Sequence, residues 1–533
     1  MLFNLNSIFN TRFPCTAGVE ACLAGFIDDG CDFGQVYGHL RPWWPRDVRE
    51  FDTLPARMRD RRQKDFDLRA AAVSSNRIKN PRIPPRRVWD LYANRVLPYY
   101  VLSPHPSGDH WLPDNLWAVS HSWCATSSRT SVLTTINGKS WHVPIPRGTT
   151  LNKIREELLI LGAEYVFLDV LCLRQKDELL PEFEGVRKRE WKLDIPTIGH
   201  IFNESMWRPV IVYFNGLGLP FSDSPVDPND QFHWFNRVWT LQETPNVALI
   251  GGLEHKLGKI MLSSSGYRPP GISEDFLRLF NCSKLDLTDI QTALQHIKSR
   301  AYSNPVDQVA CLAYLLECPT LPIYDADMDV EVAWSMLVEC LPEFERSRLL
   351  FSDFGPRNPS GSWRPTWKQV MNCTRFRPAF GFDKHGDDRG KLMHLDGSSP
   401  HVGYKHGFDA YYHTVYSIRN CRIHISQGSS DEKSRCSVEI PLKGAAECCS
   451  IEATEWGESI LPGSTYHLIS TGWLKYWIVA QVEGMRCING ERALQVSKIS
   501  TLIIPDSYSP IWIPREEQFI EKLDGSYQLV VWR

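Results

Sequence analysis

Leu116-Trp117-Ala118-Val119-Ser120 is a short apolar run that ends in a small polar residue. A run of this kind is typical of a strand buried on both faces of a parallel sheet, and we predict a strand over Leu116–His121. Similar runs follow at residues 165–170 and 209–214, and residues 247–250 have the character of a fourth strand. These four runs are the predicted strands of one domain.

Helical patterns separate the runs. Thr150 is placed to cap a helix whose apolar residues fall on one face, and Gly162 is placed to end it. Asp194 is expected to cap a short helix through residues 198–202, and residues 235–244 read as a helix that Pro245 stops. Strands that alternate with helices predict an α/β fold with a parallel sheet and right-handed crossovers.

The rest of the chain has a different character on each side of this core. Residues 1–110, with basic runs such as Arg59-Asp60-Arg61-Arg62, are irregular and predict an N-terminal extension on an α/β domain of residues 111–255. Amphipathic patterns in residues 256–355 predict a helical connector. After a linker rich in Pro, Gly and Ser near residues 354–362, short alternating runs predict a β-rich C-terminal region over residues 356–533.

The composition narrows the class of protein. A length of 533 residues predicts two to four domains, and a net charge of −3, from 59 basic and 62 acidic residues, argues against a nucleic-acid binder. No apolar run is long enough for a membrane span, and the N-terminus lacks the pattern of a signal peptide. The 15 cysteines are scattered without C-x-x-C spacing, so we expect reduced thiols, no metal site and a cytoplasmic protein.

Three blocks carry a resemblance to a known family. They are Trp117-Ala118-Val119-Ser120-His121-Ser122-Trp123, Leu168-Asp169-Val170-Leu171-Cys172-Leu173-Arg174-Gln175 and Arg237-Val238-Trp239-Thr240-Leu241-Gln242-Glu243. In order and spacing they resemble the signature blocks of the fungal heterokaryon-incompatibility (HET) domain. Asp194-Ile195-Pro196-Thr197-Ile198-Gly199-His200-Ile201-Phe202 resembles the helix between the last two blocks, with Phe202 where Tyr is common. Ser362-Trp363-Arg364-Pro365-Thr366-Trp367 looks like a feature of the basidiomycete branch.

The resemblance implies an effector of non-self recognition and programmed cell death, with homo-oligomers and incompatibility or signalling proteins as partners. HET domains are similar to TIR domains, which have a flavodoxin-like parallel sheet. TIR domains that cleave NAD+ carry their catalytic glutamate in a W-C-x-x-E motif, and Trp239 to Glu243 have the same spacing here, with Thr240 in place of cysteine. The resemblance therefore implies Glu243 as the catalytic residue of an NAD+ glycohydrolase, with NAD+ as substrate and no cofactor.

Polar residues fall where a parallel sheet binds its ligands, outside the carboxyl ends of the strands. We expect Ser120, Asp169, Arg237 and Glu243 to converge there and bind a nucleotide ribose and pyrophosphate, in a pocket walled by Trp123 or Trp239. The N-terminus of the helix at Arg237 would favour an anion. The Glu243 carboxylate would stabilise the oxocarbenium-like charge, or hold the ribose hydroxyls, when the nicotinamide bond breaks.

Structural interpretations stand beside these roles. Glu243 is equally explained by a salt bridge to Arg237 or to Arg174, and Asp169 by a cap on its loop. Trp123 is a candidate for the core or a lid as well as for ring stacking. Cys124 beside His121 suggests a thiol nucleophile, but no third orienting group is indicated, and Cys172 belongs in the core. The alternative function is a non-enzymatic, self-associating signalling module.

Overall fold

The computed structural model describes residues 1–102, 112–203, 208–243, 247–253, 259–263, 269–282, 289–352, 354, 358, 362–373, 393–394, 411–426, 435–441, 448–455, 460–461, 464–470, 476–488, 490–503 and 525–532. The chain forms two compact units. The first unit comprises Met1–Asp286, Ser299–Leu315 and Pro319–Met328, and the second comprises Leu287–Lys298, Leu316–Cys318 and Asp329–Arg533. Parts of the predicted connector thus belong to each unit, and the boundaries near residues 255 and 355 stay predictions.

A seven-stranded mixed sheet forms the centre of the first unit, in the order β11-β10-β9-β5-β8-β3-β4. Its four central strands are parallel, as predicted: β10 (Val247–Ile250), β9 (Val210–Tyr213), β5 (Leu116–His121) and β8 (Tyr165–Leu168). Antiparallel strands extend both edges, namely β11 (Met261–Ser263) on one side and β3 (Arg87–Asp90) with β4 (Arg95–Pro98) on the other. The sheet is therefore mixed around a parallel centre.

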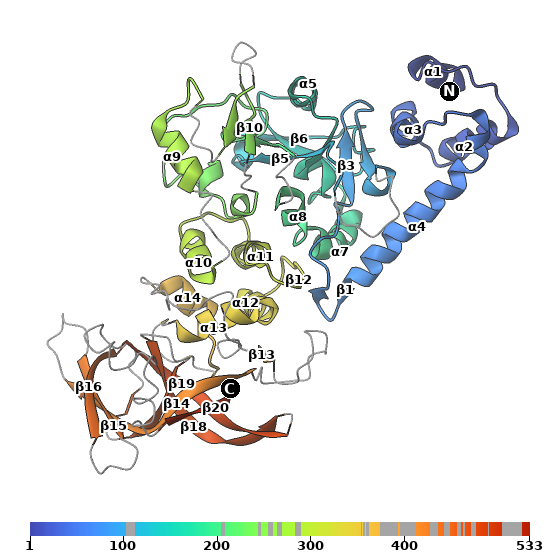
Figure 1. The fold of residues 1–533 in the computed structure, drawn as a ribbon. Coiled ribbons are helices and arrows are strands. Elements are labelled where there is room, and N and C mark those ends of the chain that lie inside the picture. Colours follow the sequence, from blue (N-terminus) through green and yellow to red (C-terminus); the bar gives the residue numbers. More distant parts are fainter. Residues whose placement is uncertain are drawn as a thin grey trace. The chain divides into compact units, whose positions relative to one another are not determined.

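The predicted helix after β5 is confirmed as α5 (Leu151–Leu161). The Thr150 side chain accepts a hydrogen bond from the backbone of Lys153, and Gly162 ends the helix at φ 96°, a left-handed conformation that glycine adopts without strain. Between β8 and β9 the chain forms α6 (Asp169–Cys172), α7 (Glu184–Asp194) and α8 (Ile198–Asn203). Figure 1 shows α5 and α8 on opposite sides of the sheet.

Two predictions in this region are wrong. Asp194 is the last residue of α7 rather than an N-cap, because its carboxylate accepts hydrogen bonds from the Arg86 guanidinium at 2.7 and 3.0 Å. Residues 235–243 form no α-helix either; they contain two 3-10 turns, η6 (Trp234–Asn236) and η7 (Trp239–Leu241). Arg237 between them is extended, because its backbone forms a parallel bridge with Ala301.

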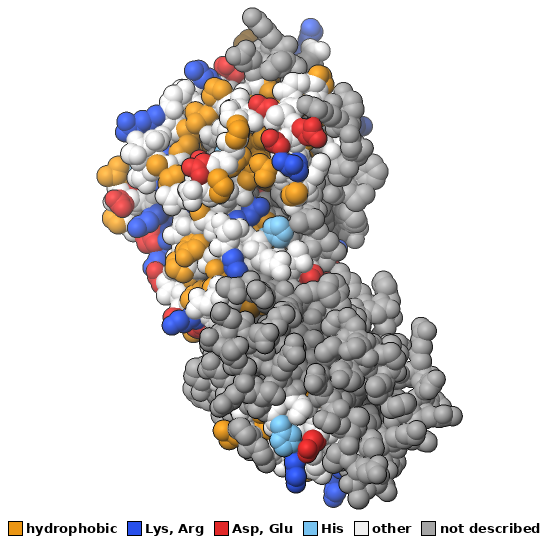
Figure 2. Space-filling model, turned by 90° about the vertical axis from the view of Figure 1, so that its left-hand side faces the viewer, with side chains coloured by type: hydrophobic (Ala, Val, Ile, Leu, Met, Phe, Trp, Pro, Cys, Tyr) orange, Lys and Arg blue, Asp and Glu red, His pale blue; other side chains and the backbone are white. Residues whose placement is uncertain are grey.

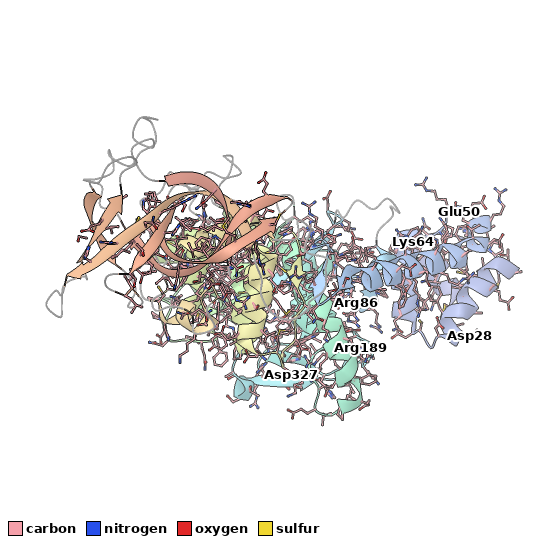
Figure 3. The ribbon with its side chains drawn as sticks, turned by 90° about the horizontal axis from the view of Figure 1, so that it is seen from below. Asp28, Glu50, Lys64, Arg86, Arg189 and Asp327 are labelled. Carbon is pink, nitrogen blue, oxygen red and sulfur yellow. The ribbon has the colours of Figure 1, made fainter. Side chains whose placement is uncertain are left out.

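The first hundred residues are more regular than expected. They form α1 (Leu2–Ile8), α2 (Ala17–Asp28), α3 (Phe33–Leu40) and the long α4 (Leu54–Ala72). The helices share an apolar cluster of their own that includes Leu5, Val19, Val36 and Phe51. Figure 3 shows Lys64 on α4 and Arg86 nearer α7, which carries Arg189. The N-terminal segment is thus a packed helical part of the first unit.

Shorter elements complete the first unit. They are η1 (Arg41–Trp43), η2 (Val48–Asp52), β1 (Val73–Ser74), β2 (Arg77–Ile78), η3 (Tyr99–Val101), η4 (Thr126–Ser128), β6 (Arg129–Val132), β7 (Val143–Pro146), η5 (Pro181–Phe183), α9 (Glu274–Cys282), α11 (Pro305–Leu315) and β12 (Leu321–Pro322). Strands β6 and β7 pair as a hairpin directly after β5, and β12 pairs with β2.

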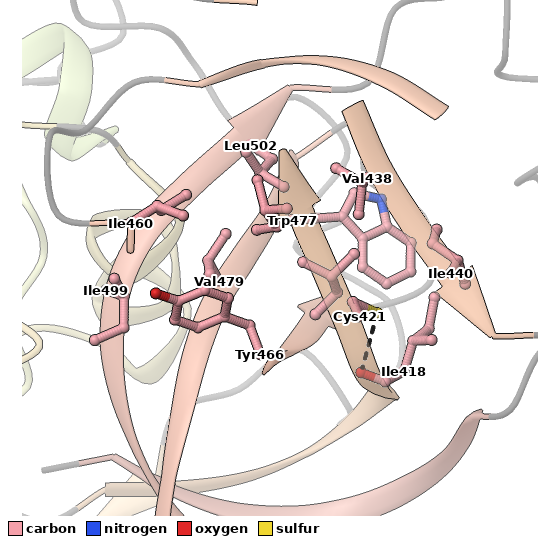
Figure 4. Packing of buried hydrophobic residues seen from close by; sticks show 12 residues of the cluster. Ile418, Cys421, Val438, Ile440, Ile460, Tyr466, Trp477, Val479, Ile499 and Leu502 are labelled. Atoms are coloured by element: carbon pink, nitrogen blue, oxygen red, sulfur yellow. Dashed lines mark hydrogen bonds between the residues drawn. The ribbon is translucent and has the colours of Figure 1, made fainter. Parts of the chain in front are cut away.

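The second unit contains the predicted β-rich region. Its helices are α10 (Ile290–Lys298), α12 (Val330–Cys340), α13 (Glu343–Phe351) and α14 (Trp367–Asn372). A curled, mostly antiparallel sheet follows, made of β13 (Met393–His394), β14 (Tyr411–Ser426), β15 (Arg435–Pro441), β16 (Cys448–Glu455), β17 (Thr465–Ser470), β18 (Tyr476–Ile488), β19 (Glu491–Ile503) and β20 (Gly525–Trp532). Its inner face packs around Trp477, Val438 and Ile440, which Figure 4 shows turned toward one another.

Candidate functional site

The candidate site lies at the carboxyl end of β5, where the direction of chain winding changes. After β5 the chain crosses to β8 on one side of it and then returns to β9 on the other side. The crevice at such a reversal, outside the carboxyl ends of the two diverging strands, is where open α/β sheets bind ligands. Ser120 and His121 are the last two residues of β5, so their side chains are set at this reversal by the strand itself.

A chain of hydrogen bonds joins Trp234, Ser120 and Glu243. The indole Nε1 of Trp234 donates to Ser120 Oγ at 2.7 Å, and Ser120 Oγ donates to Glu243 Oε2 at 2.6 Å. Because an indole nitrogen can only donate, the Ser120 hydroxyl accepts from it and turns its own hydrogen toward the carboxylate. Ser120 and Trp234 are buried, at 1 % and 0 % exposed. The orientation of the Ser120 hydroxyl is therefore set by its two partners.

The Glu243 carboxyl group is poised near neutrality. Burial raises its pKa to about 7, and the nearby charge of Asp169 adds to this rise, while the Ser120 hydrogen bond and the charges of His121 and Arg237 oppose it. Among the described residues Glu243 forms no salt bridge, so neither proposed ion pair explains its position. Near pH 7 the group is divided between its protonated and ionised forms.

His121 and Asp169 form a second hydrogen-bonded pair beside Glu243. His121 Nε2 lies 2.7 Å from Asp169 Oδ1, and His121 Nδ1 lies 3.1 Å from the backbone oxygen of Ser122. Asp169 Oδ1 also accepts the backbone N–H of Val170 at 2.7 Å. Since a carbonyl and a carboxylate are both acceptors, the arrangement favours an imidazolium that donates from both nitrogens. Burial disfavours this charge, but Asp169, the backbone bond to Ser122 and the charge of Glu243 together outweigh it, so the pKa of His121 is raised.

Asp169 bonds to the backbone of its own loop and to a side chain of the candidate site, and its role toward a ligand stays a prediction. It begins α6 and accepts the Val170 N–H, and it binds His121, which in turn lies at the end of the same strand as Ser120. Its charge also acts on Glu243. Ser120, Asp169 and Glu243 are therefore brought together, two of them by direct contact and the third through His121.

Arg237 and Trp239 make their hydrogen bonds and ring contacts elsewhere. The Arg237 guanidinium donates to Ser303 Oγ at 2.8 Å and to the Gln231 backbone oxygen at 3.3 Å, and only its charge acts on Glu243. The Trp239 ring lies against Tyr324, with 6.2 Å between ring centroids. Because no α-helix begins at Arg237, the predicted anion site at a helix N-terminus is wrong. A pocket at this edge of the sheet stays a prediction.

Trp123 lies beside the His121–Asp169 pair and is half-buried rather than part of the core. Its ring centroid is 5.7 Å from that of His121, and the guanidinium carbon of Arg129 lies 5.2 Å from its ring centroid. An aromatic face between a histidine and an arginine suits the stacking of a planar ligand ring. Trp123 is thus not a core residue, and ring stacking stays a prediction.

The cysteines near the site do not resemble nucleophiles. Burial raises the pKa of Cys124, which keeps its thiol protonated. Cys172 is fully buried, and its pKa is raised to about 12, as expected for a core residue. The thiol-hydrolase interpretation therefore gains no support from this geometry.

Two partners of the predicted residues had no predicted role in the nucleotide site, although His121 was expected at the end of the same strand as Ser120. Trp234 orients Ser120, and His121 binds Asp169. The sequence offers a sign of the role of His121, since this residue follows Ser120 at the end of a buried strand. The sequence offers no such sign for Trp234, because its aromatic neighbours Phe214 and Phe235 give it the character of an ordinary core residue.

Metal-binding groups, membrane-spanning helices and surface charge also bear on what this site could bind. In the described part of the chain no group of three or more His, Cys, Asp and Glu side chains is arranged to hold a metal ion. None of the helices described is long and apolar enough to cross a membrane. On the face shown in Figure 2, the basic and acidic side chains described for the first unit are interspersed rather than gathered by sign. Comparison of the chain with family models, curated proteins and solved structures finds no match.

Proposed function

We propose that this chain is a HET-domain protein of the basidiomycete type, a cytoplasmic effector of non-self recognition and cell death that acts through TIR-like cleavage of NAD+. The order of its parallel strands supports a flavodoxin-like core: numbered along the chain, the strands lie in the order 2-1-3-4. The three signature blocks also lie near one another, at the end of β5, at the start of α6 and in the segment before β10.

One observation carries the enzymatic part of the proposal. Glu243 Oε2 lies 2.6 Å from Ser120 Oγ at the carboxyl end of β5, without a salt bridge in the described residues and with a pKa raised to about 7. Structural glutamates are usually paired or solvated, whereas catalytic ones are held where their charge is not neutralised. Glu243 therefore has the surroundings of a reactive carboxylate.

The reaction uses this carboxylate at the carbon that develops charge. The C–N bond between ribose and nicotinamide breaks, nicotinamide leaves as a neutral ring with the bonding electron pair, and the ribose carbon becomes oxocarbenium-like. The ionised Glu243 stabilises that charge or holds the ribose hydroxyls. A water oxygen then bonds to the carbon and releases one proton, so that NAD+ and water give nicotinamide, ADP-ribose and H+. The Ser120 hydroxyl, oriented by Trp234, holds Glu243 in position.

Incubation of the purified full chain with NAD+ tests the proposal through the release of nicotinamide. We expect Glu243→Gln, which keeps the shape but loses the charge, to lower the rate by roughly a hundredfold or more. The matched control is Glu156→Gln, the same change at an exposed position of α5; its rate should equal that of the wild type.

The same experiment separates the enzyme from the non-enzymatic alternative. A wild-type protein that releases no nicotinamide above the background would contradict the enzymatic proposal. Cell death and self-association that survive Glu243→Gln would then assign the function to a signalling module that acts by binding alone.

A further inference from the structure

Arg129 is an arginine without an acidic partner beside the candidate site. It opens strand β6, and its guanidinium carbon lies 5.2 Å from the ring centroid of Trp123. One nitrogen, Nη2, donates to Thr126 Oγ1 at 2.8 Å, while Nε is buried without a hydrogen-bond partner. No salt bridge to Arg129 is present in the described part of the chain. A buried guanidinium N–H that nothing satisfies is costly and indicates a missing acceptor.

Arg237 is the second arginine in this region. It is 7 % exposed, and its two hydrogen bonds go to uncharged oxygens, of Ser303 and Gln231. The charge of Asp307 acts on Arg237, but the hydrogen bonds that its carboxylate accepts come from the Tyr324 hydroxyl, at Oδ1, and the backbone of Asn304, at Oδ2. In the described residues Arg237, too, forms no salt bridge with a carboxylate.

The charge of Arg129 also acts on the Arg237 guanidinium. Burial lowers the pKa of Arg237, and the charge of Arg129 lowers it further, while Asp307 and Glu243 oppose this. Like charges that act on each other cost free energy, and a bound anion would offset this cost. Guanidinium groups present several N–H donors in a planar fork that matches phosphate oxygens.

We propose that Arg129 binds a diphosphate, with Arg237 adding only its charge, and that Arg129 is the residue through which the site distinguishes phosphorylated nucleotides from nucleosides. Naming the diphosphate as that of a dinucleotide such as NAD+ rests on the proposed function. Binding itself requires no cleavage. Trp123, which already lies against Arg129 and His121, is placed to stack on a ring of the same ligand.

Binding to the full chain tests this with three probes: ADP, inorganic pyrophosphate and adenosine. We expect the wild type to bind ADP more tightly than adenosine, and pyrophosphate to compete with ADP. Arg129→Gln should weaken ADP binding by roughly tenfold or more and leave adenosine binding unchanged. Arg189→Gln, at an exposed position of α7, is the matched control; its affinities should equal those of the wild type.

A second variant and a measurement of folding separate loss of binding from loss of structure. Arg129→Lys keeps the charge but loses the planar fork, so we expect an intermediate loss of ADP affinity. Melting temperatures without ligand show whether each variant is folded. ADP binding no tighter than adenosine binding, pyrophosphate that does not compete, or a folded Arg129 variant with wild-type affinity for ADP would each overturn the proposal.

The outcome is separable from that of the proposed function. If NAD+ is not cleaved but ADP binds through Arg129, the diphosphate site stands and the glycohydrolase proposal fails. If NAD+ is cleaved through Glu243 while Arg129→Gln binds ADP as the wild type does, the diphosphate site alone is wrong.

Discussion

Two glutamates of the first unit are held in opposite ways. Glu190, on α7, has its Oε1 2.5 Å from Arg87 and 4.0 Å from Arg86, and its Oε2 3.6 Å from Arg174. Burial raises the pKa of Glu190, but the three arginines outweigh it and the net shift is downward. Glu243 has a serine hydroxyl as its close partner and a pKa raised to about 7.

The difference separates a structural carboxylate from a reactive one. The charge of Glu190 is neutralised by arginines that come from two distant stretches of the chain, residues 86–87 and 174, so it ties those stretches to α7. No described residue neutralises the charge of Glu243 in an ion pair, so this charge is available to act on a bound ligand. Sequence alone does not distinguish them, because both are glutamates in mixed polar and apolar surroundings. The identity of the partner decides the role.

The largest expected effect on stability comes from Glu190→Gln. The neutral amide removes the negative charge that three arginines share, although Arg86 keeps its ion pair with Asp194; breaking such a buried ion-pair network costs about 3 kcal/mol or more. The free energy of unfolding, measured by urea titration, should fall by that amount. Glu182→Gln, at an exposed position before α7, is the control and should change it little. A loss well under 1 kcal/mol for Glu190→Gln would remove the contrast with Glu243.

The two glutamates should also respond oppositely to pH. The pKa of Glu243 is raised from an unfolded value near 4.3, so its contribution to stability is complete below that value and is lost as the pH rises through about 7. The pKa of Glu190 is lowered, so its contribution is present above about 4.3 and is lost as the pH falls through its folded value.

Melting temperatures of the wild type and the two Gln variants across the pH range test this. Glu243→Gln should become more stable than the wild type as the pH rises toward 8, by at most about 4 kcal/mol. The deficit of Glu190→Gln should shrink in acid. The rate of NAD+ cleavage should rise with pH through about 7, as Glu243 ionises. Parallel pH profiles for the two variants would contradict the assignment.

The parallel centre of the sheet was predictable because its strands are local apolar runs. The antiparallel edge was not, since β3 pairs with β8 across about 75 residues of chain and nothing in its own sequence indicates that partner. The helices of the N-terminal segment were missed for a related reason: α4 is mostly polar around its circumference and gives little periodic signal.

At the site, Ser120 and Asp169 were predictable because they end strands that must point to one edge. The conformation of the segment that leads to Glu243 was not predictable. A helix was expected over residues 235–244, but Ala301 bonds to the backbone on both sides of Arg237, and Arg300 donates to the Arg237 carbonyl at 2.9 Å. This pairing, made by a stretch some sixty residues away, replaces the helix with two short turns. Tertiary contacts overrode a plausible local pattern.

The smallest expected effect is a shift in the pH profile from Ser120→Ala. The Ser120 hydroxyl donates to Glu243 and so lowers its pKa against the effect of burial. Without this bond the pKa should rise, and the midpoint of the pH–rate profile should move upward by roughly one unit, since one unit corresponds to about 1.4 kcal/mol. Ser120→Thr, which keeps a hydroxyl, should restore the midpoint.

A change of rate without a change of midpoint would show that Ser120 acts only by packing. Ser120→Ala also leaves the buried Trp234 N–H without its acceptor, which costs about 1–3 kcal/mol of stability. The midpoint does not depend on that loss as long as the variant is folded during the assay. Ser122→Ala, two residues along, is the control: the backbone oxygen of Ser122 binds His121, and this bond survives the substitution. The midpoint of Ser122→Ala should therefore match that of the wild type.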